Sequence, residues 1–271
     1  MRPTLLAIVG LIALAAPVSA GPKEDCAQPA NLDLRIEGCT AVIAAPVGDK
    51  ATVVTAYISR AVAHMRKGSL DLATADFDKA IETDPANARG YGNRCGFKNN
   101  RKDYAGAIAD CTKAIEIDPK YALAYHNRCV SHENSSAKDA AIADCSKAIE
   151  LQPSYPDALA ERGYLYEKDK KADKALADYT AAIAINTNHR VARINRCIVN
   201  RNLGKYDDAI ADCNVVIAQY PKEPRGYHNL AEVYEKQKDK PKAIAEYKRA
   251  LEADPKFEAS LAGLRRMGAK P

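Results

Sequence analysis

Proline recurs in this 271-residue chain at a fixed interval. Pro85, Pro119 and Pro153 are 34 residues apart, and so are Pro221 and Pro255. Thr187 stands where the series would have another proline. An interval of this length indicates a short supersecondary unit repeated along the chain, because a unit that must stack on copies of itself needs the same residues in the same places.

Six consecutive units of 34 residues begin at residue 54. Position 20 is alanine in all six, and position 27 is alanine in five, with Val216 in the other. This period, with small residues at these positions and a closing proline, resembles the tetratricopeptide repeat, a helix–turn–helix unit. The resemblance implies an all-α fold, a right-handed α-solenoid, with units at 54–87, 88–121, 122–155, 156–189, 190–223 and 224–257.

Shorter segments flank the six units and are expected to cap the solenoid. Residues 39–46 resemble the second helix of a unit, so we interpret residues 21–53 as an N-terminal half-repeat cap. Cys26 is expected in an irregular segment that contains Pro29. Residues 258–271 are expected to form a C-terminal capping helix and tail.

The first 20 residues have the composition of an export signal. Arg2 precedes an apolar run from Leu5 to Ala16, and the segment ends in small residues at Ala20. Twelve apolar residues are too few to cross a membrane, which takes about 20. We interpret residues 1–20 as a bacterial-type signal peptide and expect an exported protein, periplasmic or extracellular. The alternative is a buried N-terminal core helix.

Charge argues against nucleic acid as a partner, and hydropathy argues against a transmembrane segment in the mature chain. Removing residues 1–20 takes away Arg2 and lowers the formal net charge from +5 to +4. Acidic and basic residues are interspersed and form no basic stripe with aromatic residues, so no nucleic acid is expected as a partner. No transmembrane segment is expected after residue 20.

The eight cysteines fall into pairs. Three units carry cysteine at both position 8 and position 24; the other three carry a small residue and an aromatic one there instead. In the helical hairpin that the resemblance implies, these positions are equidistant from the turn and at the separation a disulfide needs. We predict structural disulfides between Cys95 and Cys111, Cys129 and Cys145, Cys197 and Cys213, and, at the N-terminus, Cys26 and Cys39.

Other roles for the cysteines have less support. Cysteine at position 24 also occurs in cytosolic members of the family as a small core residue. Zinc would need closer cysteine spacing, and a thioredoxin-like site would need the Cys-x-x-Cys motif, which the sequence lacks. No metal or cofactor is predicted.

Arginine occupies position 7 and aspartate position 23 in the first five units. Each lies one residue before a hairpin contact position, so both side chains turn to the same side of the hairpin. We predict partly solvated ion pairs that contribute only about 1–2 kcal/mol each; the alternative is an arginine ladder for anionic ligands. The pairs are Arg60–Asp76, Arg94–Asp110, Arg128–Asp144, Arg162–Asp178 and Arg196–Asp212.

The resemblance implies a concave groove lined by the first helix of each unit. Asparagine is frequent at the groove positions, and its amide can hold an extended peptide backbone. Gly92 and Gly96 are expected to leave room for a ligand. The alternative is that the asparagines bond to neighbouring repeats. The binding candidates are Asn93, Asn99, His126, Asn127, Tyr164, Asn195, Arg201, His228 and Asn229.

The sequence therefore favours a non-catalytic exported scaffold that binds proteins or extended peptides. No nucleophile stands beside a histidine and an orienting acid, so no catalytic residue is predicted. Two alternatives remain: a tether in envelope assembly or quality control, and an enzyme whose site has no recognisable motif.

Protein purified from an oxidising compartment should contain the three disulfides of the repeats, each closed within its own unit. Non-reducing peptide mapping by mass spectrometry should recover each pair as one linked peptide. Free thiols at these positions, or bridges between cysteines of different units, would contradict the pairing.

Overall fold

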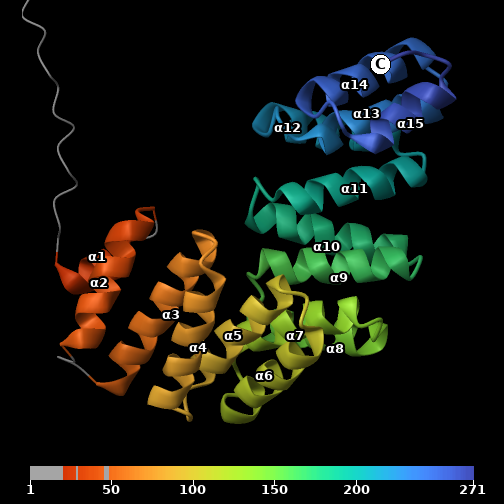
Figure 1. Cartoon of the computed structure of the whole chain (residues 1–271). Coiled ribbons are helices and arrows are strands. Elements are labelled where there is room, and N and C mark those ends of the chain that lie inside the picture. Colours follow the sequence, from red (N-terminus) through yellow and green to blue (C-terminus); the bar gives the residue numbers. More distant parts are fainter. Residues whose placement is uncertain (1–20, 29, 46–48) are drawn as a thin grey trace, which may run out of the picture. The chain divides into compact units, whose positions relative to one another are not determined.

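The structure is a computed structural model that describes residues 21–28, 30–45 and 49–271. The expected signal peptide, Pro29 and Pro46 lie outside the described residues. Within the described ranges the chain forms fifteen α-helices and no strand (Figure 1). It divides into two compact units, one ending at Gly90 and the other spanning Tyr91–Pro271.

In the first unit, helices α1 to α4 follow one another in the chain, and each packs against the next. Their bounds are α1 Pro22–Cys26, α2 Leu32–Ala44, α3 Lys50–Arg66 and α4 Leu70–Thr83.

The second unit contains helical hairpins followed by a single last helix, α15, which packs against α14. Helix α5 begins in the first unit and continues into the second. The bounds are α5 Ala88–Asn100, α6 Tyr104–Ile117, α7 Ala122–Asn134, α8 Lys138–Leu151, α9 Pro156–Lys168, α10 Ala172–Ile185, α11 Arg190–Asn202, α12 Tyr206–Gln219, α13 Pro224–Lys236, α14 Lys240–Ala253 and α15 Glu258–Arg266.

Two kinds of contact order the helices of the second unit. Each first helix packs against the second helix of its own hairpin, as α7 does against α8 and α9 against α10. First helices also pack against one another, α7 on α9, α9 on α11 and α11 on α13. A row of adjacent first helices is therefore available to build a common surface. Among the described residues, no helix is both long and apolar enough to cross a membrane.

The turn inside each hairpin uses a left-handed backbone at position 15. The φ angle there lies between 57° and 79° in all six units, yet only Gly68 and Gly204 are glycines. The other four positions hold Lys102, Ser136, Lys170 and Lys238. A residue with a Cβ pays a modest cost in this conformation, so the rest of the hairpin must enforce the turn.

Alanine lets the two helices of a hairpin approach closely. Every residue at position 20 or 27 is fully buried, including Val216. These are Ala73, Ala80, Ala107, Ala114, Ala141, Ala148, Ala175, Ala182, Ala209, Val216, Ala243 and Ala250.

The structure joins the cysteines of all four expected pairs. The Cα atoms are 5.4 Å apart in Cys95–Cys111 and in Cys129–Cys145, and 6.0 Å apart in Cys197–Cys213. In Cys26–Cys39 they are 4.4 Å apart. No cysteine among the described residues is free.

A tyrosine replaces the disulfide in two of the hairpins that lack one, and it brings a third residue with it. Tyr179 fills the space beside Gly163, where a Cβ would stand 2.8 Å from the ring. Its hydroxyl donates to Glu167 at 3.0 Å, and Tyr247 donates likewise to Glu235 at 2.6 Å. A buried phenol needs such a partner. The remaining hairpin has Phe77, which has no hydroxyl and needs none.

Each expected ion pair is present as a two-pronged contact. Arg128 donates from Nε and Nη2 to the two carboxylate oxygens of Asp144, both at 2.8 Å. The other four arginines hold their aspartates in the same way at 2.7–2.8 Å. The hydrogen bonds to Asp144 raise the pKa of the Arg128 guanidinium.

The expectation that these pairs are partly solvated is wrong for the aspartates. Asp144 is 7% exposed and the other four are between 2% and 6% exposed. The carboxylates lie at the hairpin interface, while the arginines reach it from the surface and keep about a fifth of their side chains exposed. A buried carboxylate depends on its partner far more than an exposed one does.

Four of the five arginines also bond to the preceding hairpin or, in the first unit, to α2, which the sequence reading missed. Arg128 Nη1 donates to Thr112 at 3.1 Å, Arg162 Nη1 to Ser146 at 3.2 Å and Arg196 Nη1 to Thr180 at 3.0 Å. In the first unit, Arg60 Nη1 donates to Thr40 at 2.9 Å. Thr112, Ser146 and Thr180 each lie two residues after the paired aspartate of their own hairpin. Thr40 holds the equivalent position in α2.

The N-terminal cap differs from the expectation in one respect. Cys26 is the last residue of the short helix α1 and not part of an irregular segment. Pro22 at the start of α1 and the acidic residues Glu24 and Asp25 in its first turn favour a helix there. Gly38 of α2 faces α1 so closely that a Cβ would stand 2.5 Å from the backbone nitrogen of Cys26.

Replacing Arg128 by leucine should lower the free energy of unfolding by about 3–5 kcal/mol, because the substitution leaves Asp144 buried without its counter-charge. Urea unfolding of the variant measures the loss. The double variant Arg128→Leu/Asp144→Leu is the control and should recover much of it. A loss of about 1 kcal/mol or less would mean that water reaches Asp144.

Candidate functional site

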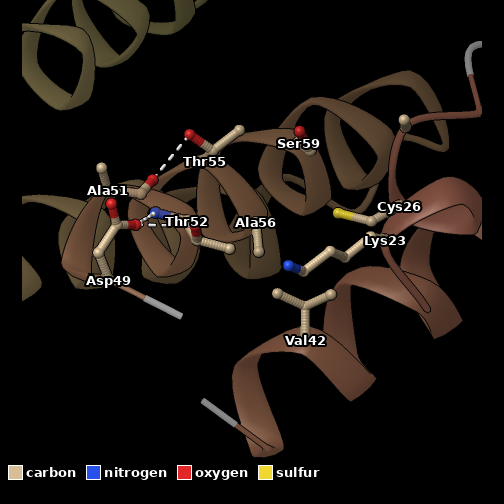
Figure 2. A pocket seen from close by; sticks show the side chains of 10 residues that line it. Lys23, Cys26, Val42, Asp49, Ala51, Thr52, Thr55, Ala56 and Ser59 are labelled. Atoms are coloured by element: carbon tan, nitrogen blue, oxygen red, sulfur yellow. Dashed lines mark hydrogen bonds between the residues drawn. The ribbon is translucent and has the colours of Figure 1, made fainter. Parts of the chain in front are cut away.

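Among the cavities formed by the described residues, one in each unit involves first helices. The cavity of the first unit has a volume of about 380 Å³ and is formed by α1, α2 and α3. Figure 2 shows the Lys23 side chain extending toward Val42 and Ala56.

Three polar residues of this first cavity are already used by helix α3. Asp49 caps the helix and accepts from the Thr52 amide at 2.9 Å and from its hydroxyl at 2.8 Å (Figure 2). The Thr55 hydroxyl donates to the Ala51 carbonyl at 2.8 Å. This arrangement serves the start of α3 and leaves Lys23 and Ser59 as the other polar residues that line the cavity.

The cavity of the second unit is the stronger candidate site. It has a volume of about 390 Å³, within the range of small-ligand and side-chain pockets. Three successive first helices, α7, α9 and α11, supply its walls. The lining residues are His126, Val130, Asp157, Ala160, Glu161, Tyr164, His189, Val191 and Asn195.

Helical periodicity places these side chains on common faces. Asp157, Ala160, Glu161 and Tyr164 are spaced i, i+3, i+4 and i+7 along α9, which aligns them on one side of that helix. His126 and Val130 are four apart on α7, and Val191 and Asn195 are four apart on α11. The α9 residues therefore form the middle of the cavity and the other two helices its sides.

Of the two carboxyl groups that line the cavity, that of Glu161 has the pKa farther from its ordinary value. Burial, and after it the charge of Glu133, raises its pKa to about 7. Lys168 acts in the opposite direction, but its ammonium is committed to Glu133 at 2.9 Å. No hydrogen bond or ion pair of Glu161 occurs within the part of the chain that the structure describes.

The other ionisable residues of the cavity are paired. Asp157 accepts from His189 Nε2 at 3.2 Å, and this hydrogen bond lowers the pKa of Asp157. His189 also caps α11, with its Nδ1 accepting from the Ala192 amide at 3.1 Å. His126 Nδ1 lies 3.0 Å from the Tyr155 hydroxyl, and burial lowers the pKa of His126, which keeps its imidazole neutral.

The structure brings three of the nine sequence candidates together in this cavity, namely His126, Tyr164 and Asn195. Tyr164 is 36% exposed, and the Lys168 ammonium lies 5.0 Å from the centre of its ring.

Two asparagine candidates bond to the neighbouring repeat, as the alternative interpretation held, and a third bonds within its own repeat. Asn127 Nδ2 donates to the Gly92 carbonyl at 3.0 Å, and Asn99 Nδ2 donates to the Asn127 carbonyl at 2.7 Å. Asn93 Nδ2 lies 3.5 Å from the Tyr121 hydroxyl. The amides of Asn127 and Asn99 therefore connect neighbouring repeats.

The expected ligand space at Gly92 and Gly96 is filled by the protein. A Cβ on Gly92 would stand 2.5 Å from the Tyr121 ring, and one on Gly96 would stand 3.1 Å from Asn127 Nδ2. Gly92 admits the last residue of its own repeat and Gly96 admits the next repeat, and neither leaves room for a ligand, which corrects the sequence interpretation.

The last three candidates lie toward the C-terminal end, outside the cavity. Arg201 pairs with Glu232. His228 Nδ1 lies 3.0 Å from the Ser260 hydroxyl, and its ring packs against Tyr247 and Phe257. Asn229 is 5% exposed.

Sequence reasoning missed Glu161, Asp157 and His189 as site residues. A signal for Glu161 was present: its position holds asparagine in four of the six units and serine in a fifth. Replacement of a neutral amide by a carboxylate at one repeat marks a local change in what the surface can bind.

The side chains that line this cavity are of kinds suited to recognition. The cavity offers one carboxylate without a bonding partner, a tyrosine face and aliphatic walls, and it holds no nucleophile activated by a base. No group of three or more metal-ligating side chains occurs among the described residues.

Family models and solved structures resemble the chain over most of its length. Models described as tetratricopeptide repeat match residues 54–87, 134–189, 198–223 and 224–257. The structure of YrrB, described as a TPR protein with an unusual peptide-binding site, is 23% identical over 70% of this chain and 97% of that chain, with a TM-score of 0.57.

Two further structures align at lower identity. The Cut9–Hcn1 hetero-tetramer of APC/C is 17% identical over 89% of this chain and 50% of that chain, with a TM-score of 0.71. Pseudomonas aeruginosa pilF is 15% identical over 80% of this chain and 99% of that chain, with a TM-score of 0.70. A search of curated proteins finds no match. At these identities the likeness shows the fold.

The Glu161 carboxyl should titrate near pH 7. Because the native state holds this proton more tightly than an unfolded chain, where glutamate titrates near 4.5, the stability contributed by Glu161 should fall by about 3 kcal/mol as pH rises from 4.5 to 7. Carbon-13 NMR of the side-chain carboxyls measures the midpoint. In Glu161→Gln the signal should vanish; a midpoint below 5 would show that the carboxyl is well solvated.

Proposed function

Since this chain belongs to the tetratricopeptide repeat family, we propose that it is a non-catalytic scaffold that binds proteins or extended peptides on the surface formed by its first helices. The cavity between α7, α9 and α11 is the observation that carries the proposal. Its walls come from three successive repeats, so a bound segment would contact all three at once.

The chemistry of the cavity supports a peptide as the occupant. Val191 and Tyr164 are large apolar side chains exposed at 46% and 36%, and they line the same cavity as the half-buried Glu161. An apolar rim around a few polar groups is typical of pockets that receive a side chain from a partner. Asn195, on the α11 side, adds an amide able to bond to a peptide backbone.

We propose further that the protein acts after export, in the periplasm or outside the cell. The signal-like segment 1–20 supports this, and so do four cysteine pairs at bonding distance, because disulfides persist in oxidising compartments. In the proposed layout a half-repeat cap at 21–53 precedes six repeats, and a capping helix and tail follow at 258–271.

Two other functions remain as alternatives to peptide binding by the scaffold alone. One is a tether that holds a larger assembly together at the envelope. The other is an enzyme, for which the described residues offer no activated nucleophile and no metal-binding cluster.

A photo-crosslinking residue at Val191 should capture a partner in intact cells, because Val191 borders the cavity. The matched control is Leu203, which is 44% exposed and ends the same helix about 18 Å away, at 1.5 Å per residue. Mass spectrometry of the adducts identifies what is bound. Equal capture at both positions, or capture at Leu203 alone, would contradict binding in the cavity.

A further inference from the structure

Glu161 differs from the residues that hold its position in the other repeats of the second unit. Asn127 at that position donates to a carbonyl of the preceding repeat and is thereby used in the fold. Glu161 cannot donate when ionised, and no bonding partner for it occurs among the described residues. Its side chain is half-buried where it lines the cavity, and this burial raises the pKa of its carboxyl.

A carboxylate partly removed from water without a partner is unfavourable, and such groups cluster at functional sites. A positive charge or a strong hydrogen-bond donor would meet the need of the Glu161 carboxylate for a partner. Tyr179 does not meet it, because its hydroxyl donates to Glu167. Lys168 does not meet it either, because its ammonium is paired with Glu133.

The charges around the cavity favour a cation over an anion. Asp157 lies one helical turn from Glu161 on α9, and its pKa is lowered, so it is ionised at neutral pH. Burial keeps His126 on α7 neutral. No lysine or arginine lines the cavity.

The walls fit the stem of a long basic side chain. Val130, Ala160 and Val191 are aliphatic, and Tyr164 adds an aromatic face. Lysine and arginine pack their methylene groups on such surfaces while their charged ends reach a polar group. An arginine or lysine cation can also stack on an aromatic ring.

We propose that this cavity receives the side chain of a lysine or arginine from an extended peptide, with the Glu161 carboxylate as its counter-ion and Tyr164 against its stem. The inference rests on the proposed function, because it names the partner chemistry of the same site.

The test uses fluorescein-labelled nonapeptide pools, randomised at every position except a fixed central residue. Four pools carry lysine, arginine, leucine or glutamate at the centre, and fluorescence anisotropy with the full chain measures their affinity. The variant Glu161→Asn gives repeat 4 the residue that its neighbours carry, so it should fold. Glu150→Gln, at an exposed position of α8 outside the cavity, is the charge-matched control.

The wild type and the control should bind the lysine and arginine pools at least about tenfold more tightly than the leucine pool, and the glutamate pool most weakly. Glu161→Asn should bring the basic pools to the level of the leucine pool. Binding without a preference for basic residues, or a preference that survives Glu161→Asn, overturns this inference and leaves the proposed function standing. Binding of no pool by the wild type overturns both.

Discussion

The contact between residues 16 apart, across each helical hairpin, is the interaction on which the rest of this structure depends. It is closed by a disulfide in three hairpins and by an aromatic ring in the other three, and in five of them an arginine–aspartate pair lies beside it. The contact brings the two helices together at the buried alanines. It also lets the turn hold a left-handed residue in every hairpin, including four without glycine.

The arginine makes this local contact cooperative along the chain. One side of its guanidinium holds the buried aspartate of its own hairpin, and the remaining nitrogen reaches a hydroxyl of the hairpin before it, as Arg162 does with Asp178 and Ser146. A single side chain therefore holds the two helices of a hairpin together and also bonds that hairpin to the preceding one. Neighbour-to-neighbour coupling of this kind is what stabilises a repeat protein.

Whatever repeats in this chain could be predicted from its sequence. The hairpins and the cysteine pairing follow from the same residues returning at the same offsets. Burial of Asp144 did not follow, because solvation depends on how closely hairpins stack. Glu161 was missed for a related reason: a cavity made by α7, α9 and α11 belongs to no single repeat, and its chemistry arises where one repeat departs from its neighbours. Helix α1 lies outside the repeating pattern, so periodicity could not predict it.

Some hairpins are held by a disulfide and others by an aromatic ring, and this difference decides how reducing agents affect each of them. The hairpin that carries Glu161 and Tyr164 is closed by Tyr179 against Gly163, with the phenol tied to Glu167, and contains no sulfur. Thiols can reduce the disulfides of the hairpins on either side, Cys129–Cys145 and Cys197–Cys213, but this hairpin has no disulfide to reduce. The central wall of the cavity is thus chemically inert to the redox state of its surroundings, while the flanking walls are not.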